Sequence, residues 1–74
     1  MIDLEVINGM KEALKALRLR AGLSQDEVAA ALHIQQTTVS MWESGINMPR
    51  AALLPALAEL YGCTIDDLYG SETA

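Results

Sequence analysis

The sequence predicts one small all-α domain, and two observations support this fold class. Apolar residues recur every three or four positions through most of the 74 residues, which is the period of a helix that buries one face. Serine, threonine and glycine, which favour helix ends, stand at the limits of these periodic stretches. Alternation typical of a strand occurs only at Ile2, Leu4 and Val6.

The first predicted helix begins at Ile7, and Gly22 is its expected C-terminal stop, because glycine readily adopts the left-handed conformation that ends a helix. Its apolar face consists of Ile7, Met10, Leu14, Leu17 and Ala21.

A capping box marks the start of the second predicted helix. The Ser24 hydroxyl can accept a hydrogen bond from a first-turn amide, while the Glu27 carboxylate reaches back to the Ser24 amide. The inner face of this helix comprises Val28, Ala29 and Leu32.

A turn over residues 33–35 separates the second helix from the third. His33 stands where the chain should adopt a left-handed conformation, for which histidine is one of the less costly replacements of glycine. The helical period resumes at about Gln36 and ends at Ser44, with Gly45 as the cap.

A loop over residues 46–50 leads to the fourth helix. Because Pro55 lacks an amide hydrogen and belongs in a first turn, this helix should begin near Leu54, after a loose turn over residues 51–53, and end at Tyr61. Its predicted core face is Leu54, Leu57, Ala58 and Tyr61.

The last predicted helix is short and covers residues 65–69. Thr64 and Asp67 provide its capping signal, and Gly70 stops it. The expected organisation is an N-terminal extension, one domain and a tail, at residues 1–9, 10–70 and 71–74.

The charges are unevenly distributed. The net charge of -5 argues against a nucleic-acid partner when taken alone. All five basic residues, however, lie between positions 11 and 50, and the acidic excess lies in the two ends. The scattered charges predict no membrane span. The single Cys63 and the acidic Asp3 and Glu5 near the start favour a cytoplasmic protein.

The stretch from Gln25 to Ser44 has the spacing of a helix-turn-helix. The small Ala29 allows the second helix to cross close over the first. The positions expected to be apolar hold Val28, Leu32, Ile34, Val39 and Trp42.

The sequence resembles the phage repressor and Cro-type DNA-binding family, often called Xre-type, over about residues 11–70. The motifs that carry the resemblance are LSQ at the second helix, TVS.WE.G in the third, LLP.LA in the fourth and the TIDDL ending. The resemblance implies a five-helix lambda-repressor-like domain whose third helix lies in the DNA major groove.

The resemblance also implies roles for individual residues. The base-contact candidates are Gln36, Thr37, Ser40 and Met41, and the backbone-contact candidates are Gln25, Thr38, Asn47 and Arg50. Arg18 and Glu43 are expected to form a structural ion pair between the first and third helices. Because glutamine can pair with adenine and the threonine methyl can pack on thymine, a half-site containing A·T pairs is favoured.

The resulting prediction is a transcriptional regulator, a repressor, that binds a double-stranded operator as a homodimer. The apolar candidates for the two-fold contact are Leu53, Leu60, Leu68 and Tyr69. The alternative is a protein-interaction module, such as an antitoxin-like subunit with a protein partner and secondary DNA binding, which the acidic net charge favours.

No enzyme, cofactor or metal site is predicted. The chain has one histidine, His33, and one cysteine, Cys63, so it offers neither a metal-ligand set nor a nucleophile paired with a base. Asp66 and Asp67 are expected to be helix caps rather than a reactive carboxylate pair.

Overall fold

The structure is a computed structural model that describes residues 4–70. This part of the chain holds five α-helices and one 3-10 helix and contains no strand, as the all-α prediction requires. The elements are α1 (Leu4–Arg20), α2 (Gln25–Leu32), α3 (Gln36–Ser44), the 3-10 helix η1 (Ala51–Leu53), α4 (Leu54–Tyr61) and α5 (Ile65–Leu68).

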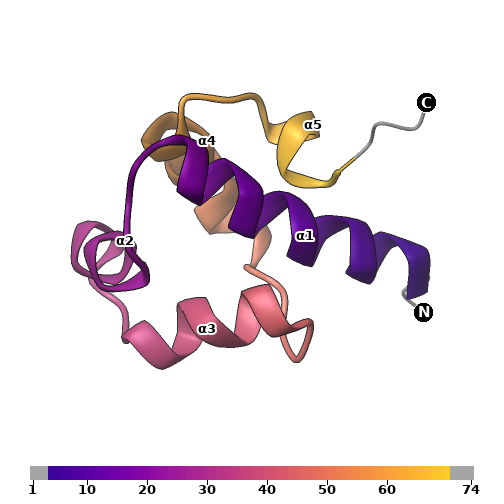
Figure 1. Cartoon of the computed structure of the whole chain (residues 1–74), viewed down its shortest axis with the longest axis horizontal. Coiled ribbons are helices and arrows are strands. Elements are labelled where there is room, and N and C mark those ends of the chain that lie inside the picture. The colour runs from indigo at the N-terminus through magenta and orange to yellow at the C-terminus, as the bar shows by residue number, and fades with distance from the viewer. Residues whose placement is uncertain (1–3, 71–74) are drawn as a thin grey trace.

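The long helix α1 organises the fold. It contacts α3 on one side and α4 and α5 on the other (Figure 1). Its core-facing residues include Met10 and Leu14, each only 1% exposed. The remaining core residues are Val28, Ala29, Val39, Trp42, Leu54, Leu57, Ala58, Tyr61 and Leu68.

The limits of α1 differ from the prediction at both ends. The helix begins at Leu4 rather than at Ile7, so Leu4 and Val6 are helical despite their alternating pattern, while Ile2 lies outside the described residues. It ends at Arg20, and Ala21, predicted on the apolar face, is exposed. The turn follows directly, because the amide of Gly22, at φ 77°, donates to the carbonyl of Leu19.

A close backbone contact holds the N-terminal half of α1 against the end of α5. A Cβ atom at Gly70 would collide with the backbone of Gly9, and one at Gly9 would lie 3.4 Å from the carbonyl oxygen of Tyr69. Glycine at position 70 therefore allows the two segments to meet, whereas a Cβ at position 9 would make only an ordinary van der Waals contact. Residues 4–9 of the predicted extension lie within α1. The predicted tail, residues 71–74, is outside the described residues.

The local signals in the middle of the chain are confirmed. The Glu27 amide donates to Ser24 Oγ at 3.0 Å, and the Ser24 amide donates to Glu27 Oε1 at 2.8 Å, which completes the capping box of α2. His33 is left-handed, with φ 59°, and Gly45 ends α3 at φ 82°.

The C-terminal helices lie where they were predicted, but one residue predicted to be exposed is buried. The turn η1 precedes α4, which starts at Leu54 with Pro55 in its first turn. The helix α5 ends at Leu68, one residue earlier than expected. Leu68 is fully buried, so it was wrongly predicted to be exposed for a two-fold contact: α5 packs against α1 and α4 and turns this side chain into the core.

Candidate nucleic-acid interface

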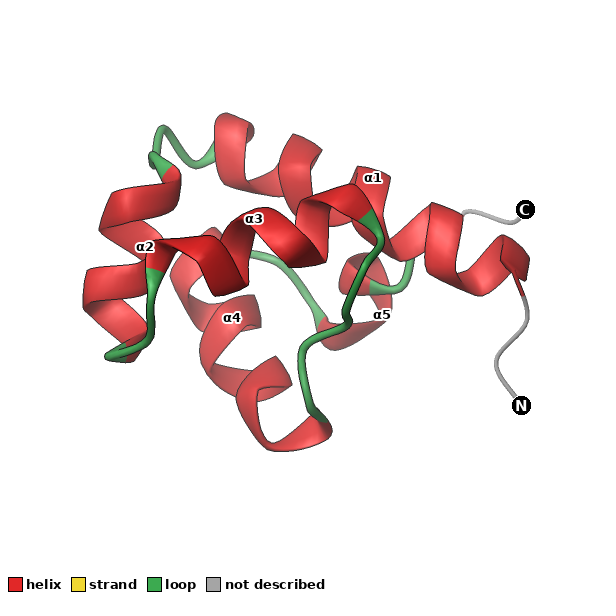
Figure 2. Ribbon diagram, turned by 90° about the horizontal axis from the view of Figure 1, so that it is seen from below, coloured by secondary structure: helices red, strands yellow, loops and turns green. Residues whose placement is uncertain are grey.

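The helix-turn-helix consists of α2, the turn and α3, which lies across one side of the molecule (Figure 2). Val39 and Trp42 anchor α3 in the core, at 0% and 3% exposure. Ile34 is half-buried and fills the turn between the helices. These contacts fix which side of α3 faces outward.

The four base-contact candidates share the outer side of α3. Their positions along the helix place them opposite to Val39 and Trp42. Gln36 and Thr37 are exposed at the amino end of the helix, while Ser40 and Met41 are half-buried one turn later. The structure therefore brings all four onto one continuous surface.

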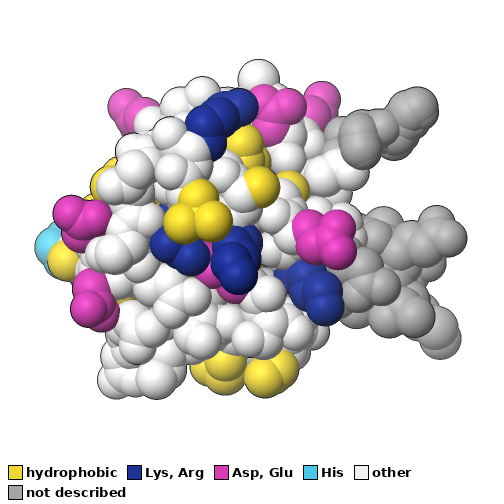
Figure 3. Space-filling model, in the orientation of Figure 1, with side chains coloured by type: hydrophobic (Ala, Val, Ile, Leu, Met, Phe, Trp, Pro, Cys, Tyr) yellow, Lys and Arg dark blue, Asp and Glu magenta, His cyan; other side chains and the backbone are white. Residues whose placement is uncertain are grey.

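This surface carries no net charge. Apart from Glu43, every residue of α3 is uncharged, and the Glu43 side chain is only 5% exposed. On the face seen in Figure 3, Lys and Arg side chains lie near the top edge and across the middle, and the lower edge over α3 shows no charged side chain. Contacts from this helix to DNA would thus depend on neutral donors, acceptors and methyl groups.

A buried ion pair joins α1 to α3 beneath this surface. Arg18 Nε donates to Glu43 Oε2 at 2.7 Å, and Arg18 Nη2 donates to Glu43 Oε1 at 2.9 Å. Arg18 Nη1 also donates to the carbonyl of Leu23 at 2.9 Å. The Arg18 and Glu43 side chains are 9% and 5% exposed.

The ionised states of this pair stabilise each other. Burial alone would raise the pKa of the Glu43 carboxyl, but the hydrogen bonds from Arg18 and Gln25 and the positive charge of Arg18 outweigh it, so the pKa lies below its ordinary value. The hydrogen bond to Glu43 raises the pKa of the Arg18 guanidinium against the opposing effect of burial.

Two glutamines extend the pair to the outer surface of α3. Gln25 Nε2 donates to Glu43 Oε1 at 3.0 Å, and Gln36 Nε2 donates to Gln25 Oε1 at 2.6 Å. The sequence assigned Gln25 and Gln36 separate roles and did not predict this contact. A local signal for it was absent, because the two residues come from the first turns of different helices.

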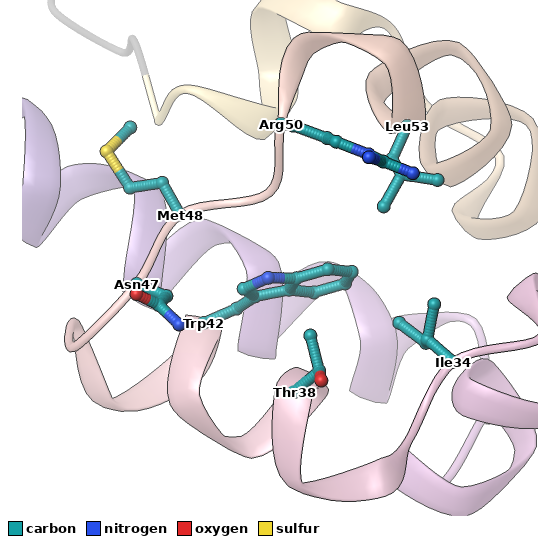
Figure 4. A pocket seen from close by; sticks show the side chains of 7 residues that line it. All are labelled: Ile34, Thr38, Trp42, Asn47, Met48, Arg50 and Leu53. Atoms are coloured by element: carbon teal, nitrogen blue, oxygen red, sulfur yellow. The ribbon is translucent and has the colours of Figure 1, made fainter.

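The other backbone-contact candidates gather in a pocket of about 260 Å³ between α3 and the loop and 3-10 helix that follow it. Thr38 comes from α3, and Asn47 and Arg50 come from the following loop. In Figure 4, Arg50 and Leu53 lie on one side of the Trp42 ring and Thr38 lies on the other. Ile34 and Met48 complete the lining. Gln25 is separate from this group and lies beside Gln36.

Asn47 also reaches toward the outer surface of α3. Its Nδ2 lies 3.8 Å from the sulfur of Met41. This contact links the loop after α3 to the last of the base-contact candidates.

Three titratable groups outside this surface have pKa values that are shifted by burial or by helix capping. Burial raises the pKa of the Tyr61 phenol to about 12, and it raises the pKa of the half-buried Cys63 thiol. Hydrogen bonds from Thr64 lower the pKa of Asp67, whose carboxylate caps α5. Among the described residues, no group of three or more His, Cys, Asp or Glu side chains could hold a metal ion.

No helix within residues 4–70 combines the length and the apolarity that crossing a bilayer requires.

Comparisons with known proteins agree with this geometry. A family model described as helix-turn-helix matches residues 14–68. The chain is 34% identical over 61 residues to the HTH-type transcriptional activator BcrR of Enterococcus faecalis. That match covers 82% of this chain and 30% of the relative, so the chain spans less than a third of the length of that protein. A comparison with solved structures found no significant match.

Proposed function

The chain belongs to the Xre/Cro-like helix-turn-helix family of DNA-binding transcriptional regulators, which are not enzymes, and from this premise we propose that it recognises a specific double-stranded operator with α3 in the major groove. The observation that carries the proposal is the exposed, uncharged outer surface of α3, whose amino end presents Gln36 and Thr37. A surface of this kind can discriminate bases but supplies little nonspecific attraction.

Base recognition falls to the four outer residues of α3. The Gln36 amide can pair with the N6 and N7 positions of adenine, and the Thr37 methyl can pack on a thymine methyl. Ser40 adds a hydroxyl that can serve as donor or acceptor, and Met41 adds apolar contact. The favoured half-site contains A·T pairs.

Backbone contacts hold α3 in the groove. Gln25 is the first residue of α2, so its amide is one of the free donors at a helix N-terminus. Thr38 near the start of α3, and Asn47 and Arg50 in the loop after it, border the pocket. Gln25 before α3 and the loop residues Asn47 and Arg50 after it would hold phosphates on either side of the reading surface.

The functional unit we propose is a homodimer acting in the cytoplasm. Two copies would present their α3 helices to half-sites about one helical turn apart. Among the predicted two-fold candidates, Leu53 and Leu60 are half-buried and Tyr69 is 39% exposed. Leu60 also borders an apolar groove with Leu32 and Ala56, and a second copy could cover this groove.

The proposed outcome of binding is repression, because occupancy of an operator is enough to exclude polymerase. The relative named above is called an activator, so the direction of regulation is tested with a reporter gene placed behind the selected operator. Increased reporter expression with the chain present would contradict repression and leave operator binding intact.

Selection of bound duplexes from a random pool at low salt tests operator binding. We expect a palindromic motif with A·T pairs in each half. Gln36→Ala should weaken binding to the selected duplex by about 1–3 kcal/mol and leave binding to random DNA almost unchanged. Both affinities are measured by fluorescence anisotropy.

Gln35→Ala is the matched control, because Gln35 is an exposed neighbouring glutamine whose side chain does not cap α3. It should leave the ratio of specific to random binding unchanged. Equal weakening of both duplexes by Gln36→Ala would contradict base reading. Failure to select any motif would favour the protein-interaction alternative.

A further inference from the structure

We propose that Glu43, which is too deeply buried to touch DNA, sets the purine preference of Gln36. It does so through a chain of two hydrogen bonds, from Gln36 to Gln25 and from Gln25 to Glu43, whose donor-to-acceptor direction is fixed. Glu43 is then a positioning residue for specificity as well as half of an ion pair. The inference rests on the proposed function, in which Gln36 faces a base edge.

Glu43 fixes the direction of these hydrogen bonds because an ionised carboxylate can only accept them. Arg18 donates to both of its oxygens, at 2.7 and 2.9 Å. Only a donor can therefore approach the carboxylate from α2. Gln25 meets this requirement with Nε2, which lies 3.0 Å from Glu43 Oε1.

The orientation of the Gln25 amide follows from this contact. With Nε2 turned to Glu43, Oε1 must point the other way, because the reversed amide would place its oxygen against the carboxylate. Oε1 can only accept, and it does so from Gln36 Nε2 at 2.6 Å. The polarity imposed by Glu43 thus reaches the surface of α3.

The consequence is a fixed set of groups on Gln36. One Nε2 hydrogen is engaged by Gln25, which leaves Oε1 and the second Nε2 hydrogen without partners in the described part of the chain. Adenine offers an N6 donor and an N7 acceptor in the major groove, which match this pair of groups. Guanine offers two acceptors, O6 and N7, and its O6 would face the Gln36 oxygen. The geometry therefore favours adenine over guanine.

The test is the ratio of dissociation constants for two duplexes that differ only by A·T or G·C at one position. Gln36→Ala identifies that position in the selected motif, as the one at which its preference is lost. The natural chain should prefer adenine there by about 5- to 150-fold, the range of one well-made bidentate contact.

Gln25→Lys reverses the direction of the hydrogen bond between residues 25 and 36. An ammonium group only donates, so it satisfies Glu43 and also offers a donor to Gln36, whose oxygen then turns inward. Both Gln36 Nε2 hydrogens face the groove, and the ratio should fall to about 1 or invert in favour of guanine. The added charge strengthens binding to both duplexes alike and cancels in the ratio. Gln25→Met, of similar length and without polarity, should reduce the ratio without inverting it.

The double variant Arg18→Met with Glu43→Met tests the first step. It replaces the buried pair with apolar side chains of similar size, an exchange that often preserves stability. Gln25 then loses the carboxylate that orients it, and the adenine preference should fall at least several-fold although every proposed base contact is intact. Thermal melts verify that each variant is folded.

The outcomes separate the inference from the proposed function. A selected motif whose adenine preference survives both Gln25→Lys and the double variant overturns the inference and leaves operator recognition standing. If the adenine preference is lost in the Gln25 variants but retained in the double variant, Glu43 does not orient Gln25, and the inference is also overturned. Failure to select any motif overturns the proposed function and the inference with it.

Discussion

Glu43 illustrates how one buried side chain serves both stability and the proposed recognition surface. Its carboxylate accepts three hydrogen bonds, two from Arg18 and one from Gln25. Removing one partner of a buried ion pair leaves the other charge uncompensated, which costs more than the pair itself contributes. A domain of this size has a total stability of only a few kcal/mol, so the pair is a point of vulnerability.

Glu43→Ala should therefore destabilise the domain by about 3–5 kcal/mol and leave much of it unfolded at room temperature. Thermal or urea melts followed by circular dichroism measure the change. Glu59→Ala is the control, because Glu59 is an exposed glutamate of α4. A melting temperature for Glu43→Ala that equals that of the control would contradict a stabilising role of the pair.

The direction of the pH dependence follows from the same carboxylate. The pKa of Glu43 is lower in the folded chain than its ordinary value of 4.5. Its contribution to stability is therefore complete above pH 4.5 and is lost as the pH falls through the lower folded value. The pKa of Asp67 is lowered as well, so it acts in the same direction. The melting temperature of the natural chain should therefore fall as the pH is lowered below 4.5, which thermal melts at a series of acidic pH values measure.

The helix ends are determined by short-range backbone geometry. The amide of His33 closes α2 by donating to the carbonyls of Ala29 and Ala30, and it does so at φ 59°. Gly62 closes α4 with a similar φ of 69°. The left-handed conformation costs an L-residue roughly 1–2 kcal/mol, while glycine adopts it freely. His33 is the one described residue other than glycine with a positive φ.

His33→Gly should stabilise the domain, by up to about 1 kcal/mol, because relief of the backbone strain exceeds the larger entropy that glycine adds to the unfolded chain. Gly62→Ala provides the reciprocal measurement. A Cβ at Gly62 would meet no atom within 4 Å, so its expected cost of about 1 kcal/mol comes from backbone conformation alone. A lower melting temperature for His33→Gly would show that the imidazole contributes more than the strain removes.

The distribution of charge over the domain shapes its expected binding to DNA. The net charge is -5, and α3 supplies no cation to the proposed interface. Arg50 stands beside the motif, while Arg18 is held inside the fold by Glu43. Neutral donors displace fewer counterions from DNA than cations do. Specific contacts should therefore provide a larger share of the affinity than in a basic repressor.

The dependence of affinity on salt should accordingly be shallow. We expect the slope of log K against log salt to correspond to about two to four charges per dimer, against about ten for a strongly basic repressor. Anisotropy titrations of the selected duplex across a salt series measure this slope, and sedimentation of the complex measures its stoichiometry. A slope of about eight or more charges would mean that the basic residues of α1 reach the backbone. One bound copy per operator would contradict the homodimer.

Local signals were enough to predict most of the helix limits in this protein. The capping box at Ser24, the left-handed residue at His33 and the proline at position 55 act on their own neighbours, so the starts of α2, α3 and α4 could be read from adjacent residues. The outward positions of Gln36 and Thr37 followed from the spacing of Val39 and Trp42, because helical periodicity relates the two faces of one helix.

Features that depend on contact between distant segments could not be read in this way. The close approach of Gly9 to Gly70 joins α1 to the end of α5, and the burial of Leu68 depends on where α5 packs. The Gln25 and Gln36 contact requires two helix starts to meet. Each of these depends on the relative placement of helices, which arises from the shape of the shared core. The apolar periodicity of either segment alone does not encode that placement.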